Sequence, residues 1–71
     1  MKNRKAGNMT VTKHDIAHEM VDHGGNFAHC LALAWFAADD DNRWLIETMW
    51  SREWRHHGAM ALHRKEAKRG R

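Results

Sequence analysis

The stretch GNFAHCLALAWFAADDDNRWLIETMWSREW, Gly25–Trp54, contains both phenylalanines and all four tryptophans of the 71-residue chain. It reads as an apolar helix, a short acidic turn and a second apolar helix that returns along the first, which is a helical hairpin. The residues outside this stretch are mostly polar, histidine-rich or basic. The sequence therefore predicts an all-α protein organised around the hairpin.

The first helix of the hairpin is predicted over Phe27–Ala38, with Asn26 as its N-cap. Its apolar side chains fall into two adjacent stripes, one of Phe27, Leu31, Ala34 and Ala38 and one of Cys30, Leu33 and Ala37. Trp35 and Phe36 carry the apolar surface further round the helix. A helix that is apolar over so much of its circumference is buried on more than one side. Cys30 is accordingly expected in the core, where free cysteines are common.

The acidic turn is predicted over Asp39–Asn42, with Asp40 or Asp41 capping the helix that follows. The second helix is predicted to continue to Met49, with an inward side of Leu45, Ile46, Met49 and Trp50. Ser51 is expected to kink or break it. After that point the apolar stripe is continued by Trp54, His57, Met60 and Ala61.

A short helix is predicted before the hairpin. Thr12 and Asp15 have the spacing of a capping box, with Asp in place of the usual Glu, and the glycines after His23 end the helix. Three regions follow: a disordered tail over residues 1–11, a single helical domain over 12–63 and a basic tail over 64–71. The residues before Met9 show no apolar periodicity, so Met9 is expected to be an alternative or the true translation start.

The chain is short for a self-sufficient core. A domain of this size buries only roughly 60% of its unfolded surface, and small scaffolds usually add disulfides, a metal or a partner chain. The single cysteine, Cys30, excludes a disulfide within one chain. Two hairpins together make a four-helix bundle, so a symmetric homodimer is expected.

The charge is +3 overall, and basic residues gather at both ends of the sequence. A track of cations on the last helix is a candidate nucleic-acid contact, made of Arg64, Lys65, Lys68 and Arg69. The alternative is a solvated helix end whose cations complement the helix dipole. No signal peptide and no apolar run of membrane-spanning length is present, and one cysteine favours a reducing compartment, so a cytoplasmic protein without membrane association is expected.

Histidines suggest a weak candidate metal site. His14, His18 and Asp22 are spaced four residues apart along one helix face, and zinc is able to bridge a pair of histidines with that spacing. The alternative is the polar outer face of a short helix. No nucleophile, base and orienting group stand together in the sequence, so neither catalysis nor a cofactor is expected.

The tryptophans suggest a protein-binding surface. Trp44 lies at the edge of the inward stripe, and exposed tryptophan beside arginine is the usual composition of a binding hot spot. The candidate protein-binding residues are Trp44, Trp50, Trp54, Arg43 and Arg52.

The same region carries a family resemblance. The succession Gly-x-Phe, Ala-x-Ala-Trp, Ala-Asp, Asn-Arg, an apolar–Glu pair and an aromatic, from Gly25 to about Met60, resembles small early accessory proteins of temperate, lambdoid phages. Those proteins are encoded by short open reading frames between the exonuclease and excisionase genes. The chain departs from the group at Ser51, where relatives often carry proline. The group offers no catalytic motif.

The resemblance implies an early, non-essential, all-helical protein of the host cytoplasm with a part in host takeover. Together with the residue patterns, it predicts a non-enzymatic accessory protein that binds a host or phage protein and modulates phage development or host physiology. The alternative is a small basic DNA-binding transcriptional regulator, and a weaker third is a metal-dependent assembly through His14 and His18.

Overall fold

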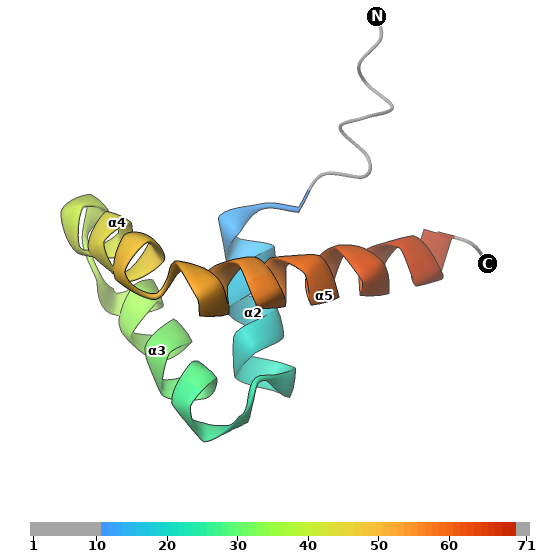
Figure 1. Cartoon of the computed structure of the whole chain (residues 1–71), viewed down its shortest axis with the longest axis horizontal. Helices are drawn as coiled ribbons and strands as arrows, with labels where there is room; N and C mark the ends of the chain where they lie inside the picture. The colour runs from blue at the N-terminus through green and yellow to red at the C-terminus, as the bar shows by residue number, and fades with distance from the viewer. Residues whose placement is uncertain (1–10, 70–71) are drawn as a thin grey trace, which may run out of the picture.

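The computed structural model describes residues 11–69, and the expectations for the tail before Val11 and for a start at Met9 concern residues outside that range. The described part consists of four helices, α2 (Lys13–His23), α3 (Gly25–Ala37), α4 (Asp40–Met49) and α5 (Ser51–Arg69), and contains no strand (Figure 1). The all-α prediction is confirmed. Helix α5 runs unbroken past residue 64, where a basic tail was predicted to begin.

The capping box at the start of α2 is confirmed. The Asp15 amide donates to Thr12 Oγ1 at 3.0 Å, and the Thr12 amide donates to Asp15 Oδ2 at 3.0 Å. At the other end of the helix the Gly24 amide donates to the Met20 carbonyl at 3.0 Å. Both ends of α2 are therefore fixed by the residues next to it in the sequence.

The predicted N-cap of α3 is wrong. The helix begins at Gly25 and has Gly24 as its N-cap, with no side-chain capping bond from Asn26. Gly25 has φ +81°, a conformation that glycine adopts without steric cost. Because this one residue reverses the chain, α3 starts before Asn26, and α2 and α3 lean against each other from their shared turn (Figure 1).

The acidic turn also differs in detail. Asp39, rather than Asp40 or Asp41, is the N-cap of α4, and its Oδ1 accepts from the Asn42 amide at 2.9 Å. Asp40 and Asp41 occupy the first turn, where their carboxylates favour the positive end of the helix dipole. The expected break at Ser51 is confirmed, because α4 ends at Met49 and α5 starts at Ser51.

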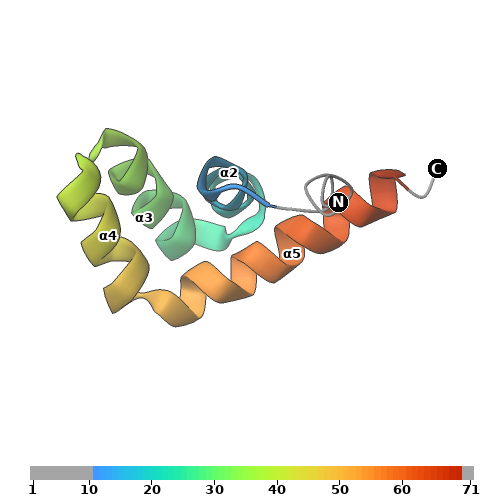
Figure 2. The same cartoon turned by 90° about the horizontal axis from the view of Figure 1, so that it is seen from above.

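The core forms where α2 packs against α3 and α5, and α4 packs against both α3 and α5 (Figure 2). Its buried residues come from three of the described helices: Ala17, Met20, Ala28, Ala32, Trp35 and Trp54. Three alanines at this centre allow the helix backbones to approach closely. Of the residues expected to continue the stripe on α5, Trp54, His57 and Ala61 are buried, whereas Met60 is exposed.

The predicted stripes of α3 are wrong. The buried side consists of Ala28, Ala32 and Trp35, while Phe27 and Cys30 are exposed. The tight turn at Gly24 places α2 against the alanine side, which leaves the cysteine side uncovered. The predicted inward side of α4 is also largely wrong, because this helix contributes no buried residue. Ile46 packs against the core, but Leu45, Met49 and Trp50 are exposed.

Candidate functional site

Trp35 joins the four described helices. Its side chain is 1% exposed, and its indole Nε1–H donates to Glu47 Oε2 of α4 at 2.7 Å. The ring centroid lies 5.4 Å from that of Trp54 in α5 and 5.0 Å from that of His14 in α2. Because Trp35 contacts both α2 and α4, it fixes the position of these two helices relative to each other at this point.

Arg43 is fixed on top of Trp35. Its guanidinium donates to the carbonyl oxygens of Trp35 at 2.9 Å and Phe36 at 3.2 Å, and its Cζ lies 4.1 Å from the Trp35 ring centroid. Carbonyls at the end of a helix have no partner within the helix, so Arg43 acts as a C-terminal cap for α3. The cation–π contact adds to this, and the arginine is held in one place.

A pocket of about 450 Å³ opens beside these residues. We call it the Trp44 pocket; it is lined by Lys13, His14, Trp35, Asp40, Arg43, Trp44 and Glu47. Trp44 forms its outer wall with 62% of its surface exposed, and Lys13 Nζ lies 3.1 Å from Glu47 Oε1. An aromatic wall with charges of both signs is suited to holding a protruding side chain of another protein.

A second uncovered surface runs along α3. We call it the α3 outer face: Phe27, Cys30, Leu33, Ala34 and Ala37, all exposed and all apolar. Their spacing of three and four residues places them on one side of the helix, opposite Ala28 and Ala32. At one end of this face the Phe27 ring lies 6.4 Å from the Trp50 ring.

The predicted protein-binding residues are divided by the fold. Arg43 and Trp44 line the Trp44 pocket together. Trp50 and Arg52 line another hollow, where α4 meets α5. Trp54 is 9% exposed and belongs to the core, so it presents no surface to a partner. Lys13 and His14 lie on α2, so no local pattern identifies them as neighbours of Trp44, whereas the spacing of Glu47 from Trp44 on α4 could have revealed that contact.

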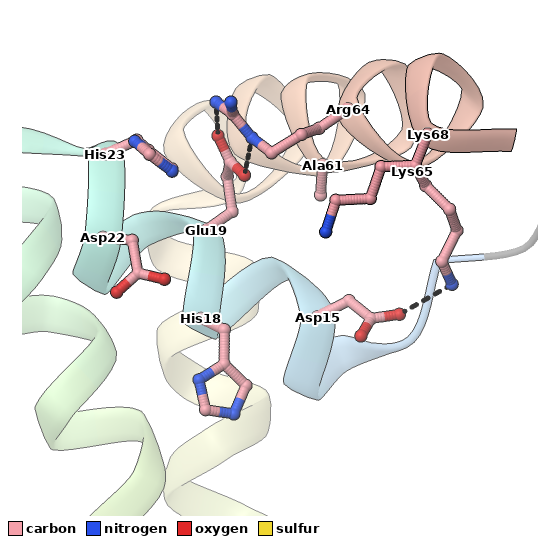
Figure 3. A pocket seen from close by; sticks show the side chains of 9 residues that line it. All are labelled: Asp15, His18, Glu19, Asp22, His23, Ala61, Arg64, Lys65 and Lys68. Carbon is pink, nitrogen blue, oxygen red and sulfur yellow. Dashed lines mark hydrogen bonds and ion pairs between the residues drawn. The ribbon is translucent and has the colours of Figure 1, made fainter. Parts of the chain in front are cut away.

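The basic residues of α5 face an acidic side of α2 (Figure 3). Arg64 donates two hydrogen bonds to Glu19, at 2.9 and 2.8 Å, and Lys65 Nζ lies 3.1 Å from Asp15 Oδ2. Lys68 lines the pocket between α2 and α5 together with Arg64, Lys65, Asp15 and Glu19. The side chain of Arg69 lies outside the described part. Two of the four predicted nucleic-acid contacts are thus engaged within the chain.

These contacts lower the pKa values of both carboxylates, Glu19 and Asp15. The hydrogen bonds from Arg64 lower the pKa of Glu19, which is 6% exposed, and the opposing effect of burial is smaller. The pKa of Asp15 is lowered first by the Thr12 amide and further by Lys65. A carboxylate whose pKa is lower in the folded state stabilises the fold above its unfolded pKa, and this stability is lost as the pH falls through the folded value.

The stability of the protein should therefore fall in acid. We expect the Tm of the wild type to decrease between about pH 5 and pH 3. Glu19→Gln should have a Tm a few degrees lower at pH 7 and a smaller decrease over the same range, measured by far-ultraviolet circular dichroism. Glu66→Gln removes the same charge from an exposed position of α5 and should follow the wild type. An unchanged pH dependence in Glu19→Gln would contradict the role of this ion pair.

Two histidines of α2, His14 and His18, pack against aromatic rings. The His14 ring lies edge-on to Trp35, and the His18 ring lies 4.9 Å from that of Phe36. Among residues 11–69, no group of three or more His, Cys, Asp and Glu side chains is placed to hold a metal ion. The weak candidate of His14, His18 and Asp22 gains no further ligand from the fold.

None of the four described helices is both long enough and apolar enough to cross a lipid bilayer. Comparison of the chain with protein families, curated proteins and solved structures gives no match.

Proposed function

We propose that this chain is a non-enzymatic accessory protein that acts by binding another protein through the Trp44 pocket. The observation that carries the proposal is the large exposed area of Trp44 beside an arginine that the fold holds in place. Tryptophan and arginine are the residues most enriched among binding hot spots.

The site is prepared for binding before a partner arrives. Arg43 is held by two hydrogen bonds and a ring contact, and Glu47 is held by Trp35 and Lys13. Little conformational entropy remains to be lost at these residues when a partner docks. Covering the exposed part of the Trp44 indole would contribute about 1.5–3 kcal/mol, the usual range for burying a large apolar side chain.

The biological setting follows from the resemblance to small early proteins of lambdoid phages. The partner is a host or phage protein in the host cytoplasm, and the chain modulates phage development, including the choice between lysis and lysogeny, or host physiology. It acts by stoichiometric occlusion, as a homodimer, and requires no cofactor. The shared residues that support this setting, Ala32–Trp35 and Asn42–Arg43, include both Trp35 and Arg43.

The test is affinity capture with matched variants. Wild type, Trp44→Ala and Met60→Ala are immobilised and exposed to lysate from infected and uninfected bacteria. Met60 is 41% exposed on α5 and does not line the Trp44 pocket, so it controls for loss of exposed apolar area. We expect a protein retained by wild type and Met60→Ala and lost at least about tenfold with Trp44→Ala, a change of about 1.4 kcal/mol. Equal retention by all three would contradict the proposal.

DNA binding is the alternative that the same preparation tests. With Arg64 and Lys65 paired to α2, we expect only weak duplex binding, measured by fluorescence anisotropy, that weakens steeply with salt. Tight binding to a defined sequence at physiological salt would favour the DNA-binding regulator instead.

A further inference from the structure

We propose that two copies of this chain pair through the α3 outer face, with the two α3 helices antiparallel and crossing near Cys30 and Ala34. The inference rests on the homodimer included in the proposed function and names the surface that forms it. It leaves the Trp44 pocket free in each copy.

The exposed apolar residues of α4 extend this surface. Glu47 faces α2, because it pairs with Lys13 at 3.1 Å. Leu45 and Met49 each lie two residues from Glu47, about 160° around the helix, so they lie on the side of α4 away from α2. The α3 outer face also points away from α2, because Ala28 and Ala32 on the opposite side are buried against it. The contact of Phe27 with Trp50, whose ring centroids lie 6.4 Å apart, joins the exposed residues of α3 to those at the end of α4.

The exposed apolar area approaches that of a standard interface. Five large apolar side chains of α3, α4 and the C-cap of α4 are between 42% and 68% exposed: Phe27, Leu33, Leu45, Met49 and Trp50. Side chains of this size present on the order of 150–250 Å² each, so their exposed parts together amount to roughly 500 Å². Cys30, Ala34 and Ala37 add to this, and a standard interface buries about 800 Å² on each partner. The small residues in the middle let the two helices approach closely.

The charges favour the antiparallel arrangement. Helix α3 carries no Asp, Glu, Lys or Arg, so pairing buries no such charge. Its C-terminal end is followed by the acidic run Asp39–Asp41, all exposed. Its N-terminal end lies next to the junction of α4 and α5 through the contact of Phe27 with Trp50, and Arg52 and Arg55 are exposed there.

A two-fold axis through the middle of α3 therefore places the arginines of one copy near the aspartates of the other, at both ends of the interface. A parallel arrangement would place like charges together. Such a surface is self-complementary, which is the requirement for a symmetric dimer.

The experiment measures association of the full chain by sedimentation equilibrium under reducing conditions. Leu33→Arg places a charge in the middle of the surface, and Met60→Arg places the same charge on exposed α5. We expect wild type and Met60→Arg to dimerise, and Leu33→Arg to weaken dimerisation at least about tenfold while keeping the wild-type circular dichroism spectrum. Equal dimerisation of Leu33→Arg and Met60→Arg would overturn the surface.

Charge exchange and cross-linking report the orientation. Asp41→Arg should weaken the dimer, and Asp41→Arg combined with Arg52→Asp should restore it; failure of the double variant to recover would overturn the antiparallel arrangement. Mild oxidation should join two chains through Cys30, which lies near the proposed axis, and a dimer without this disulfide would also overturn it. A wild type that is monomeric at every concentration would overturn the pairing altogether. Binding of a partner through the Trp44 pocket would be unaffected by that result, because the affinity capture with Trp44→Ala tests it separately.

Discussion

Trp35→Ala is expected to remove a large part of the stability of the chain. Removing a buried tryptophan typically costs about 3–5 kcal/mol, through lost transfer energy and the cavity left behind. A chain of this length has a total stability of about 4–10 kcal/mol at the usual value per residue. Trp35 also connects α2, α4 and α5 through His14, Glu47 and Trp54, so its loss loosens three contacts between helices at once.

Urea unfolding followed by circular dichroism checks this. Trp44→Ala is the matched control, because it removes the same side chain from an exposed position and should change stability by no more than about 0.5 kcal/mol. Trp35→Phe keeps an aromatic ring but loses the indole donor to Glu47, so it should lie between the two. A Trp35→Ala variant as stable as Trp44→Ala would show that the core is not centred on this residue.

Gly24→Ala should cause the next largest loss, of about 1–3 kcal/mol or more, the range for overpacking a close contact. A Cβ at this position would lie 2.5 Å from the Met20 carbonyl oxygen and 2.6 Å from Ala28 Cβ. Neither neighbour is the flexible end of a side chain, so α2 and α3 would have to move apart. Their packing supplies most of the buried residues, which is why a single methyl group has a large effect.

Gly25→Ala provides the comparison within the same turn. A Cβ there meets nothing within 4 Å, so the cost arises only from the positive φ and should be about 1–2 kcal/mol. Thermal unfolding of both variants separates the two causes. If Gly25→Ala proves the more destabilising, conformation rather than close approach limits the α2–α3 turn.

The features predicted well from the sequence are those set by neighbouring residues. The capping box of Thr12 and Asp15, the end of α2 at the glycines and the break before Ser51 depend on contacts within a few positions. The faces of α3 could not be predicted in the same way, because the helix is apolar nearly all round. The turn at Gly24 places α2 against Ala28 and Ala32, so that side of α3 is buried and the side with Cys30 and Leu33 is exposed.

In the candidate site, too, the features set by neighbouring residues were predicted and the contacts between distant residues were not. The exposure of Trp44 followed from its place at the edge of the stripe in its own helix. The ion pair of Glu19 with Arg64 joins residues 45 positions apart and depends on the path of α5 across α2. No local pattern encodes that path, so cations expected to contact nucleic acid are found instead on the acidic side of α2.

The most direct test of the account is the exchange of the four indole N–H protons with water, followed by nuclear magnetic resonance in the isolated protein at increasing concentration. Slow exchange is expected for the indole N–H of Trp35, which is bonded to Glu47, and fast exchange for that of Trp44 at every concentration, because its pocket stays open until a partner binds. Slow exchange of the Trp44 indole in the isolated protein would contradict the account, since the proposed binding surface would already be covered.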